Sequence, residues 1–213
     1  MPHTIFFDLD GTLTDSGPGI MNCAQLALDH FHISVEDPAQ LRTFVGPPLR
    51  VSFGRFGLND QEAEEAIRIF RSRYLTVGKF ENVPYPGIPQ LLQQLNEEGH
   101  RLFVATSKPE ETAKEILHHF QLDQYFELIC GATMDSSRES KEAVLSYLLA
   151  QTEAPSVLMV GDTEFDVIGA NAHHIPTIGV TWGYGDEASM RQAGAAAIVS
   201  TPEELHQILD TMP

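Results

Sequence analysis

The stretch IFFDLDGT at residues 5–12 carries the strongest structural signal in this chain. Its first three residues are apolar and predict a short buried β-strand, after which Gly11 lets the backbone turn. Asp8 and Asp10 therefore lie at the exit of the strand. Buried carboxylates need a partner, and oxygen ligands of this kind suit Mg²⁺. The stretch predicts a magnesium site, with an ordinary acidic turn as the alternative, because Asp and Gly both favour turns.

From about residue 84 onward, apolar strand-like runs alternate with amphipathic helical patterns. This order predicts βαβ units, and therefore a mainly parallel sheet covered by helices on both faces. The fold class is thus α/β, with a doubly wound, Rossmann-like core. After the first strand, the predicted strands cover residues 102–105, 128–130, 157–160, 177–180 and 197–199, and the predicted helices cover residues 87–98, 113–120, 144–149 and 203–209.

The stretch between the first strand and these βα units has a different pattern, with helices and no convincing strand. Asn59, three residues before Glu62, is typical of a helix start with a capping box. Gly46-Pro47-Pro48 predicts a rigid turn. We therefore predict an α/β core of residues 1–15 and 83–213 and an all-helical cap domain of residues 16–82, which covers the carboxyl edge of the sheet.

The net charge of −17 argues against a nucleic acid polymer or an anionic membrane surface as a partner, because the field of the protein repels phosphates. No apolar stretch approaches the length needed to span a bilayer. Met1-Pro2-His3-Thr4 leads directly into a strand, which predicts no signal peptide. Cys23 and Cys130 are isolated and are expected to be reduced. We expect a cytoplasmic protein, as a monomer or a weak dimer.

Further polar residues are predicted at the same edge of the sheet as Asp8 and Asp10, where parallel α/β proteins bind their ligands. Each has an ordinary explanation: a hydroxyl can cap a helix, a lysine is usually solvated, and carboxylates favour helix N-termini. These explanations are independent of one another, and all of them would have to hold at one edge of the sheet. The common location of these residues therefore favours a chemical site. They are Thr106, Ser107, Lys108, Lys141, Asp162 and Asp166.

In these motifs the chain resembles the haloacid dehalogenase-like hydrolases, and within them the phosphoglycolate phosphatase-like group with a helical, C1-type cap. The resemblance covers essentially the full length. Asp8-Leu9-Asp10-Gly11-Thr12-Leu13 resembles the first family motif, Thr106 the second, Lys141 the third, and Gly161-Asp162-x-x-x-Asp166 the fourth. Four motifs in order are far more specific than any one of them.

The resemblance implies a Mg²⁺-dependent phosphatase that acts on a small phosphorylated metabolite through an aspartyl-phosphate. It makes Asp8 the nucleophile and Asp10 the general acid and base. It assigns Mg²⁺ to Asp8, the backbone carbonyl of Asp10 and Asp162, with Asp166 in contact with the ion or just behind its ligands. The residues that it implies for holding the phosphoryl oxygens are Thr106, Ser107 and Lys141.

The stretch from Val45 to Arg50 resembles the substrate-facing loop of phosphoglycolate phosphatase-like caps, so Gly46 and Arg50 are predicted to bind substrate. For Arg50, an exposed solubilising role is the alternative. The predicted substrate is 2-phosphoglycolate or a nucleoside 5′-monophosphate; a nucleotide would need an aromatic wall such as Phe44, Phe53 or Trp182. Two other functions stay open: a sugar-phosphate mutase of the same fold and, in a different class, a non-catalytic phospho-receiver module.

Overall fold

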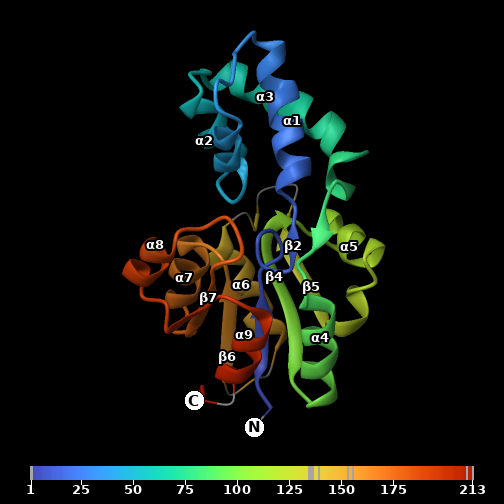
Figure 1. Ribbon diagram of the computed structural model, residues 1–213, viewed down its shortest axis with the longest axis vertical. Coiled ribbons are helices and arrows are strands. Elements are labelled where there is room, and N and C mark those ends of the chain that lie inside the picture. Colours follow the sequence, from blue (N-terminus) through green and yellow to red (C-terminus); the bar gives the residue numbers. More distant parts are fainter. Residues whose placement is uncertain are drawn as a thin grey trace. The chain divides into compact units, whose positions relative to one another are not determined.

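The computed structural model describes residues 2–133, 137–138, 140–152, 154, 156–209 and 211–212. The chain forms two compact units: a core unit of residues 1–14 and 84–213, and a helical unit of residues 15–83 (Figure 1). It leaves the core unit along β2 (Thr14–Asp15) and returns along β3 (Val83–Pro84), and these two strands pair. None of the helices in the described ranges is long and apolar enough to cross a membrane.

The core unit is built on a parallel sheet, which confirms the predicted α/β class. Across the described residues the sheet has six strands in the order β5-β4-β1-β6-β7-β8, and every neighbouring pair is parallel. From β1 the chain moves outward to β4 and β5, then crosses to β6 on the other side of β1. Strand order reverses there, and at such a point ligands bind. The strands are β1 (Thr4–Phe7), β4 (Arg101–Pro109), β5 (Leu128–Ala132), β6 (Val157–Gly161), β7 (Thr177–Val180) and β8 (Ala197–Val199).

Helices cover both faces of this sheet (Figure 1). Ile5 and Phe7 pack into one apolar cluster together with Leu92 of α4. Phe6 points the other way, into a second cluster that contains Leu145 of α6. Since both faces are covered, the last three of the four residues of β1 are apolar, without the alternation typical of a half-exposed strand. The helices are α4 (Ile88–Glu97), α5 (Glu110–His119), α6 (Lys141–Gln151), α7 (Glu164–Asn171), α8 (Glu187–Ala193) and α9 (Pro202–Leu209).

The helical unit contains α1 (Gly17–His30), α2 (Leu49–Arg55), α3 (Asp60–Tyr74) and 3₁₀ turns at Pro38–Phe44 and Gly78–Phe80. The predicted capping box is confirmed: the Asn59 side chain accepts from the Glu62 N–H at 3.0 Å, and the Asn59 N–H donates to the Glu62 carboxylate at 2.9 Å. Helix α2, which is seven residues long and begins directly after a proline, was not predicted from the sequence. Two helical turns are too short to show a clear apolar period.

Phe44 and Phe53 were considered as a wall for a nucleotide base, and the structure contradicts this. Their rings meet edge to face within the helical unit, with centroids 4.9 Å apart. Both side chains are buried. They form the core of the helical unit and offer no open aromatic face to a ligand.

Candidate active site

The turn after β1 holds the first two carboxylates at the end of the strand. Gly11 has a φ of +83°, and a Cβ added to it would lie 2.1 Å from the Asp162 carboxylate. Only glycine fits here, both for its backbone conformation and for its size. The Thr12 hydroxyl donates to the same carboxylate at 3.3 Å. The turn of β1 and the end of β6 are therefore in direct contact.

Three carboxylates from distant parts of the sequence meet at this point. Asp8 follows β1, Asp162 follows β6, and Asp166 lies in the first turn of α7. Each offers an oxygen within 4.8 Å of the other two. Asp162 is 1% exposed and Asp166 is fully buried. The predicted convergence of the first and fourth motifs is therefore present in the structure.

Lys141, the first residue of α6, is the cation at the centre of this cluster. Its Nζ lies 2.8 Å from Oδ1 of Asp8 and 2.7 Å from Oδ1 of Asp166. It also donates to the Ala105 carbonyl at 2.8 Å. With a relative exposure of 7%, this lysine is not the solvated residue of the alternative interpretation.

Asp166 has both of its oxygens engaged. One faces Lys141, and the other accepts from the backbone N–H and the hydroxyl of Thr163 at 3.1 and 2.9 Å. The second contact is the capping box of α7. The helix-capping alternative thus holds for Asp166 in addition to its place in the cluster, and the residue fits a position behind the metal ligands better than a ligand position.

Burial and mutual repulsion raise the pKa values of two carboxylates in the cluster. Burial raises the pKa of Asp8 to about 6, and the charge of Asp166 adds to this shift while Lys141 opposes it. Burial also raises the pKa of Asp162, together with the charges of Asp166 and Asp8. One ammonium faces three carboxylates, which leaves a surplus of two negative charges when all are ionised. A divalent cation with oxygen ligands fits both this charge and this donor set.

The loop after β7 completes the wall around Asp162. The Tyr184 N–H donates to the Asp162 carboxylate at 2.8 Å, and a Cβ on Gly183 would lie 2.3 Å from that carboxylate. The Trp182 indole N–H donates to the Thr12 carbonyl at 3.0 Å. Trp182 therefore fastens two loops of the site together, which is a different role from the base-stacking wall considered above. Of this loop only Trp182 was considered from the sequence, and the contact of its backbone with Asp162 was not predicted.

Asp10 and the end of β4 form the other side of the site. Both oxygens of Asp10 accept from Nζ of Lys108, at 2.8 and 2.6 Å. Thr106 is buried, and its hydroxyl accepts from the Lys108 N–H at 3.2 Å, while Ser107 is exposed. Lys108 was expected at this edge from the sequence, but no role was assigned to it. Its spacing of two residues from Thr106 was the available signal, since it places both side chains on one face of a strand; the predicted strand, however, ended at Ala105.

The other two predicted substrate residues, Gly46 and Arg50, lie in the helical unit. Gly46 has a φ of +101° in the turn before α2. The Arg50 guanidinium donates to the Glu64 carboxylate at 2.9 Å and to the Asp60 carbonyl at 3.3 Å. Arg50 is therefore paired with α3, and its role toward a substrate stays a prediction.

Together, the fold and the site define a parallel α/β protein with a buried acidic centre suited to a metal ion at the switch point of its sheet. Comparison with known proteins gives the family. Residues 5–180 match the family model of the haloacid dehalogenase-like hydrolases, and the chain belongs to this family. The resemblance stated from the sequence motifs is confirmed.

Individual relatives carry different names. A 5′-nucleotidase of Pseudomonas aeruginosa is 39% identical over 97% of this chain and 95% of its own length. The tyrosine-protein kinase PtkA of Mycobacterium tuberculosis is 42% identical over 98% of this chain and 72% of its own length. A phosphoglycolate phosphatase of Aquifex aeolicus is 32% identical over 98% of this chain and 97% of its own length. The crystal structure of a predicted phosphatase from Clostridium acetobutylicum is 41% identical, with a TM-score of 0.93 over 100% of both chains.

Proposed function

We propose that this hydrolase is a Mg²⁺-dependent phosphatase that passes the phosphoryl group of a small phosphomonoester to Asp8 and then to water. Its class, a phosphoric monoester hydrolase, follows from the family and from relatives named as phosphatases. The observation that carries the finer proposal is the position of Asp8: its carboxylate lies beside two buried carboxylates and one buried lysine. Such a group can serve as a nucleophile once its charge is balanced.

In this proposal Mg²⁺ is held by the carboxylates of Asp8 and Asp162 and by the Asp10 carbonyl, while Asp166 orients Lys141. The ion supplies positive charge that reduces the repulsion between Asp8 and an anionic substrate. Two like charges about 4 Å apart repel by roughly 4 kcal/mol at an effective dielectric constant near 20. In a chain with a net charge of −17 this balance is essential.

The chemical steps use side chains of this chain. An oxygen of Asp8 attacks phosphorus while the bond to the leaving oxygen breaks, and Asp10 gives that oxygen a proton. Asp10 then takes a proton from water, whose oxygen attacks the phosphoryl group and frees Asp8. Lys141 and the Thr106 hydroxyl hold the phosphoryl oxygens as negative charge builds up.

The helical unit is proposed to act as a cap that supplies specificity and excludes water. Within it, Gly46 and Arg50 are the proposed substrate residues. The proposed substrates are 2-phosphoglycolate and nucleoside 5′-monophosphates, in keeping with the names of two relatives. A cytoplasmic location and a monomer or weak dimer stay predictions from the composition.

A screen of small phosphates tests this proposal. With Mg²⁺ present, we expect inorganic phosphate to be released from 2-phosphoglycolate or from a nucleoside 5′-monophosphate, with kcat/KM in the range of about 10⁴ M⁻¹s⁻¹ or higher. Sugar phosphates and phosphotyrosine complete the panel. Turnover that requires a bisphosphate activator and releases no phosphate would favour the mutase. A phosphoenzyme that lasts for hours without turnover would favour the receiver module.

Mg²⁺ is also expected to stabilise the protein in a pH-dependent way. The pKa of Asp8 is raised from 3.8 to about 6 in the metal-free fold. A raised carboxyl pKa contributes stability below 3.8, and this contribution is lost as the pH rises through about 6. Above that pH the ionised cluster binds a cation best, because protons no longer compete. Saturating Mg²⁺ should raise Tm by roughly 5 to 10 °C near neutral pH and by much less near pH 5.

The measurement is thermal unfolding with MgCl₂ and with NaCl of equal ionic strength, at both pH values. The difference at each pH cancels titrations elsewhere, such as that of His100, whose pKa is lowered by burial. Asp162→Asn is the matched variant and should lose most of the Mg²⁺-dependent shift. An equal shift at both pH values, or an unchanged shift in the variant, would contradict a metal bound at this cluster.

A further inference from the structure

Lys108 is a second buried lysine in the site. Its side chain is 5% exposed, and its Nζ contacts both oxygens of Asp10, whose side chain is 17% exposed. The chain has four lysines against thirty acidic residues, and two of the four, Lys108 and Lys141, lie in this one site. A contact to both oxygens fixes the direction of a carboxylate as well as its charge.

The end of β4 is shaped to turn Lys108 inward. The pairing of β4 with β5 changes register between Ala105 and Pro109, so the strand bulges where it reaches the site. Bulges of this kind re-aim side chains beside active sites. Ser107 is exposed and Lys108 is buried, as expected for neighbours on opposite sides of a strand. On β5, a Cβ added to Gly131 would lie 2.5 Å from the Lys108 carbonyl.

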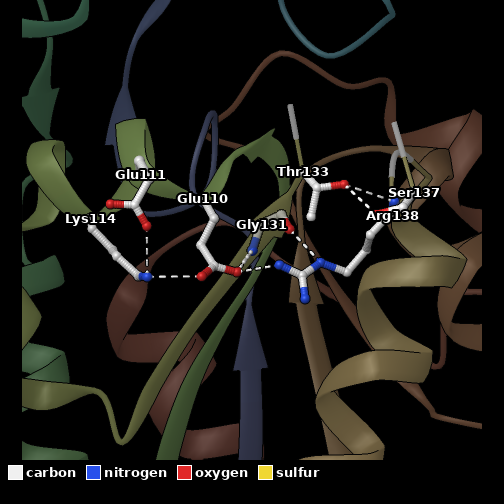
Figure 2. A network of polar contacts seen from close by, with 7 residues as sticks. All are labelled: Glu110, Glu111, Lys114, Gly131, Thr133, Ser137 and Arg138. Atoms are coloured by element: carbon white, nitrogen blue, oxygen red, sulfur yellow. Dashed lines mark hydrogen bonds and ion pairs between the residues drawn. The ribbon is translucent and has the colours of Figure 1, made fainter. Parts of the chain in front are cut away.

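A polar network anchors the segment that carries Lys108 (Figure 2). Glu110, two residues further on, accepts from the Gly131 N–H at 3.3 Å and from the Arg138 guanidinium. Arg138 also donates to the Gly131 carbonyl at 2.8 Å, and its guanidinium lies over the Tyr147 ring, 4.0 Å from the centroid. Arg138 stands three residues before Lys141 in the sequence. The network therefore ties the start of α5 to β5 and to the segment before α6.

Stability alone does not account for a buried pair of this kind. Removing two charges from water costs about as much as their attraction returns, so such pairs add little net stability. What such a pair can provide is a defined geometry of the two groups. Here the fixed group is the carboxylate to which the proposed function gives the proton transfers.

We infer that Lys108 is a positioning residue for Asp10: it holds both carboxylate oxygens so that one of them points at the leaving oxygen of the substrate. This inference rests on the proposed function and adds a residue to it. Misplacing a reacting group by about 1 Å can cost about 10²-fold in rate. The loss should concern substrates whose leaving group needs a proton, and it should depend on Asp10.

The test is Lys108→Met, measured as the single-turnover rate of leaving-group release with Mg²⁺ present. For an alkyl phosphate that the wild type hydrolyses, the rate should fall about 10²-fold with little change in KM. For p-nitrophenyl phosphate, whose leaving group is stable without a proton, it should fall less than about fivefold. Arg101→Met is the control, since Arg101 is a 43% exposed cation at the start of the same strand, paired with Glu127 at 2.7 Å, and it should behave as the wild type.

A double-mutant cycle separates positioning from other roles. In an Asp10→Asn background, adding Lys108→Met should change the residual single-turnover rate for the alkyl phosphate by less than about twofold, because the group that Lys108 orients is already gone. Lys108→Gln keeps an N–H donor without the charge and serves if the methionine variant unfolds; the Tm of every variant is recorded. With an active wild type, three results would overturn the inference. They are equal rate losses on both substrates, a raised KM, and a rate loss from Lys108→Met that is as large in the Asp10→Asn background as in the wild type. A wild type that hydrolyses no phosphate would overturn the proposed function, and the inference with it.

Discussion

Asp8→Asn is expected to lower kcat for phosphate release at least about 10⁴-fold, the scale seen when a nucleophile is removed. The amide cannot accept the phosphoryl group, and it also removes one charge from the metal site. Phosphate release from the best substrate of the screen, with Mg²⁺ present, measures this effect. The contact of 2.7 Å between Lys141 and Asp166 does not involve Asp8, so the surrounding site is expected to persist in the variant.

The same variant makes a separate prediction about stability. Because burial raises the pKa of Asp8 to about 6, its ionised form destabilises the metal-free fold above that pH. At pH values well above 6 and without metal, Asp8→Asn should therefore unfold at a Tm equal to or higher than that of the wild type. Asp123→Asn, which changes a carboxylate paired with His118 at 2.8 Å, is the control with normal activity. Substantial Mg²⁺-dependent turnover by Asp8→Asn would contradict the nucleophile assignment.

For Asp10→Asn we expect two different outcomes that depend on the leaving group. With an alkyl phosphate, kcat should fall about 10²- to 10⁴-fold, since the leaving alkoxide receives no proton. With p-nitrophenyl phosphate, the first turnover should remain measurable, and the reaction should then stall because no base activates water. A burst of p-nitrophenol, close to one per protein, followed by a slow phase would record both effects.

Isolation of the stalled protein provides the check on this result. Phosphate bound covalently to Asp8 should be detected by mass spectrometry in Asp10→Asn, and it should be absent from an Asp8→Asn/Asp10→Asn double variant. Thermal unfolding shows whether loss of the contact between Asp10 and Lys108 has disturbed the fold. Rapid steady-state turnover of an alkyl phosphate by Asp10→Asn would exclude an acid and base role for this residue.

Much of the core unit could be predicted from local sequence. The apolar runs at 157–160 and 177–180 lie within β6 and β7, and the helical pattern at 87–98 contains α4. These segments bury their apolar residues in a regular period, which a single sequence displays. No range was predicted for α2, α7 or α8, which are seven or eight residues long, because so few turns do not establish a period. β4 runs four residues beyond its prediction, to Pro109, because its polar end is stabilised by pairing with β5.

The candidate site could also be predicted only in part. The residue types and their order along the chain pointed to the meeting of Asp8, Asp162 and Asp166, since parallel strands bring their carboxyl ends to one edge. The partner of each oxygen could not be predicted. Asp166 divides its two oxygens between Lys141 and Thr163, and Trp182 donates to a carbonyl where stacking on a base had been considered.

The α/β class, the family and the set of carboxylates follow from the order of residues alone, because hydrophobic period and motif order are local properties of the chain. Which charged side chains pair with one another depends on the folded structure. Lys108 and Asp10 are 98 residues apart, and their contact at 2.6 Å depends on a bulge in β4 and on the backbone of β5. Contacts of this kind depend on how the strands pack in three dimensions, and the spacing of residues along the chain does not predict them.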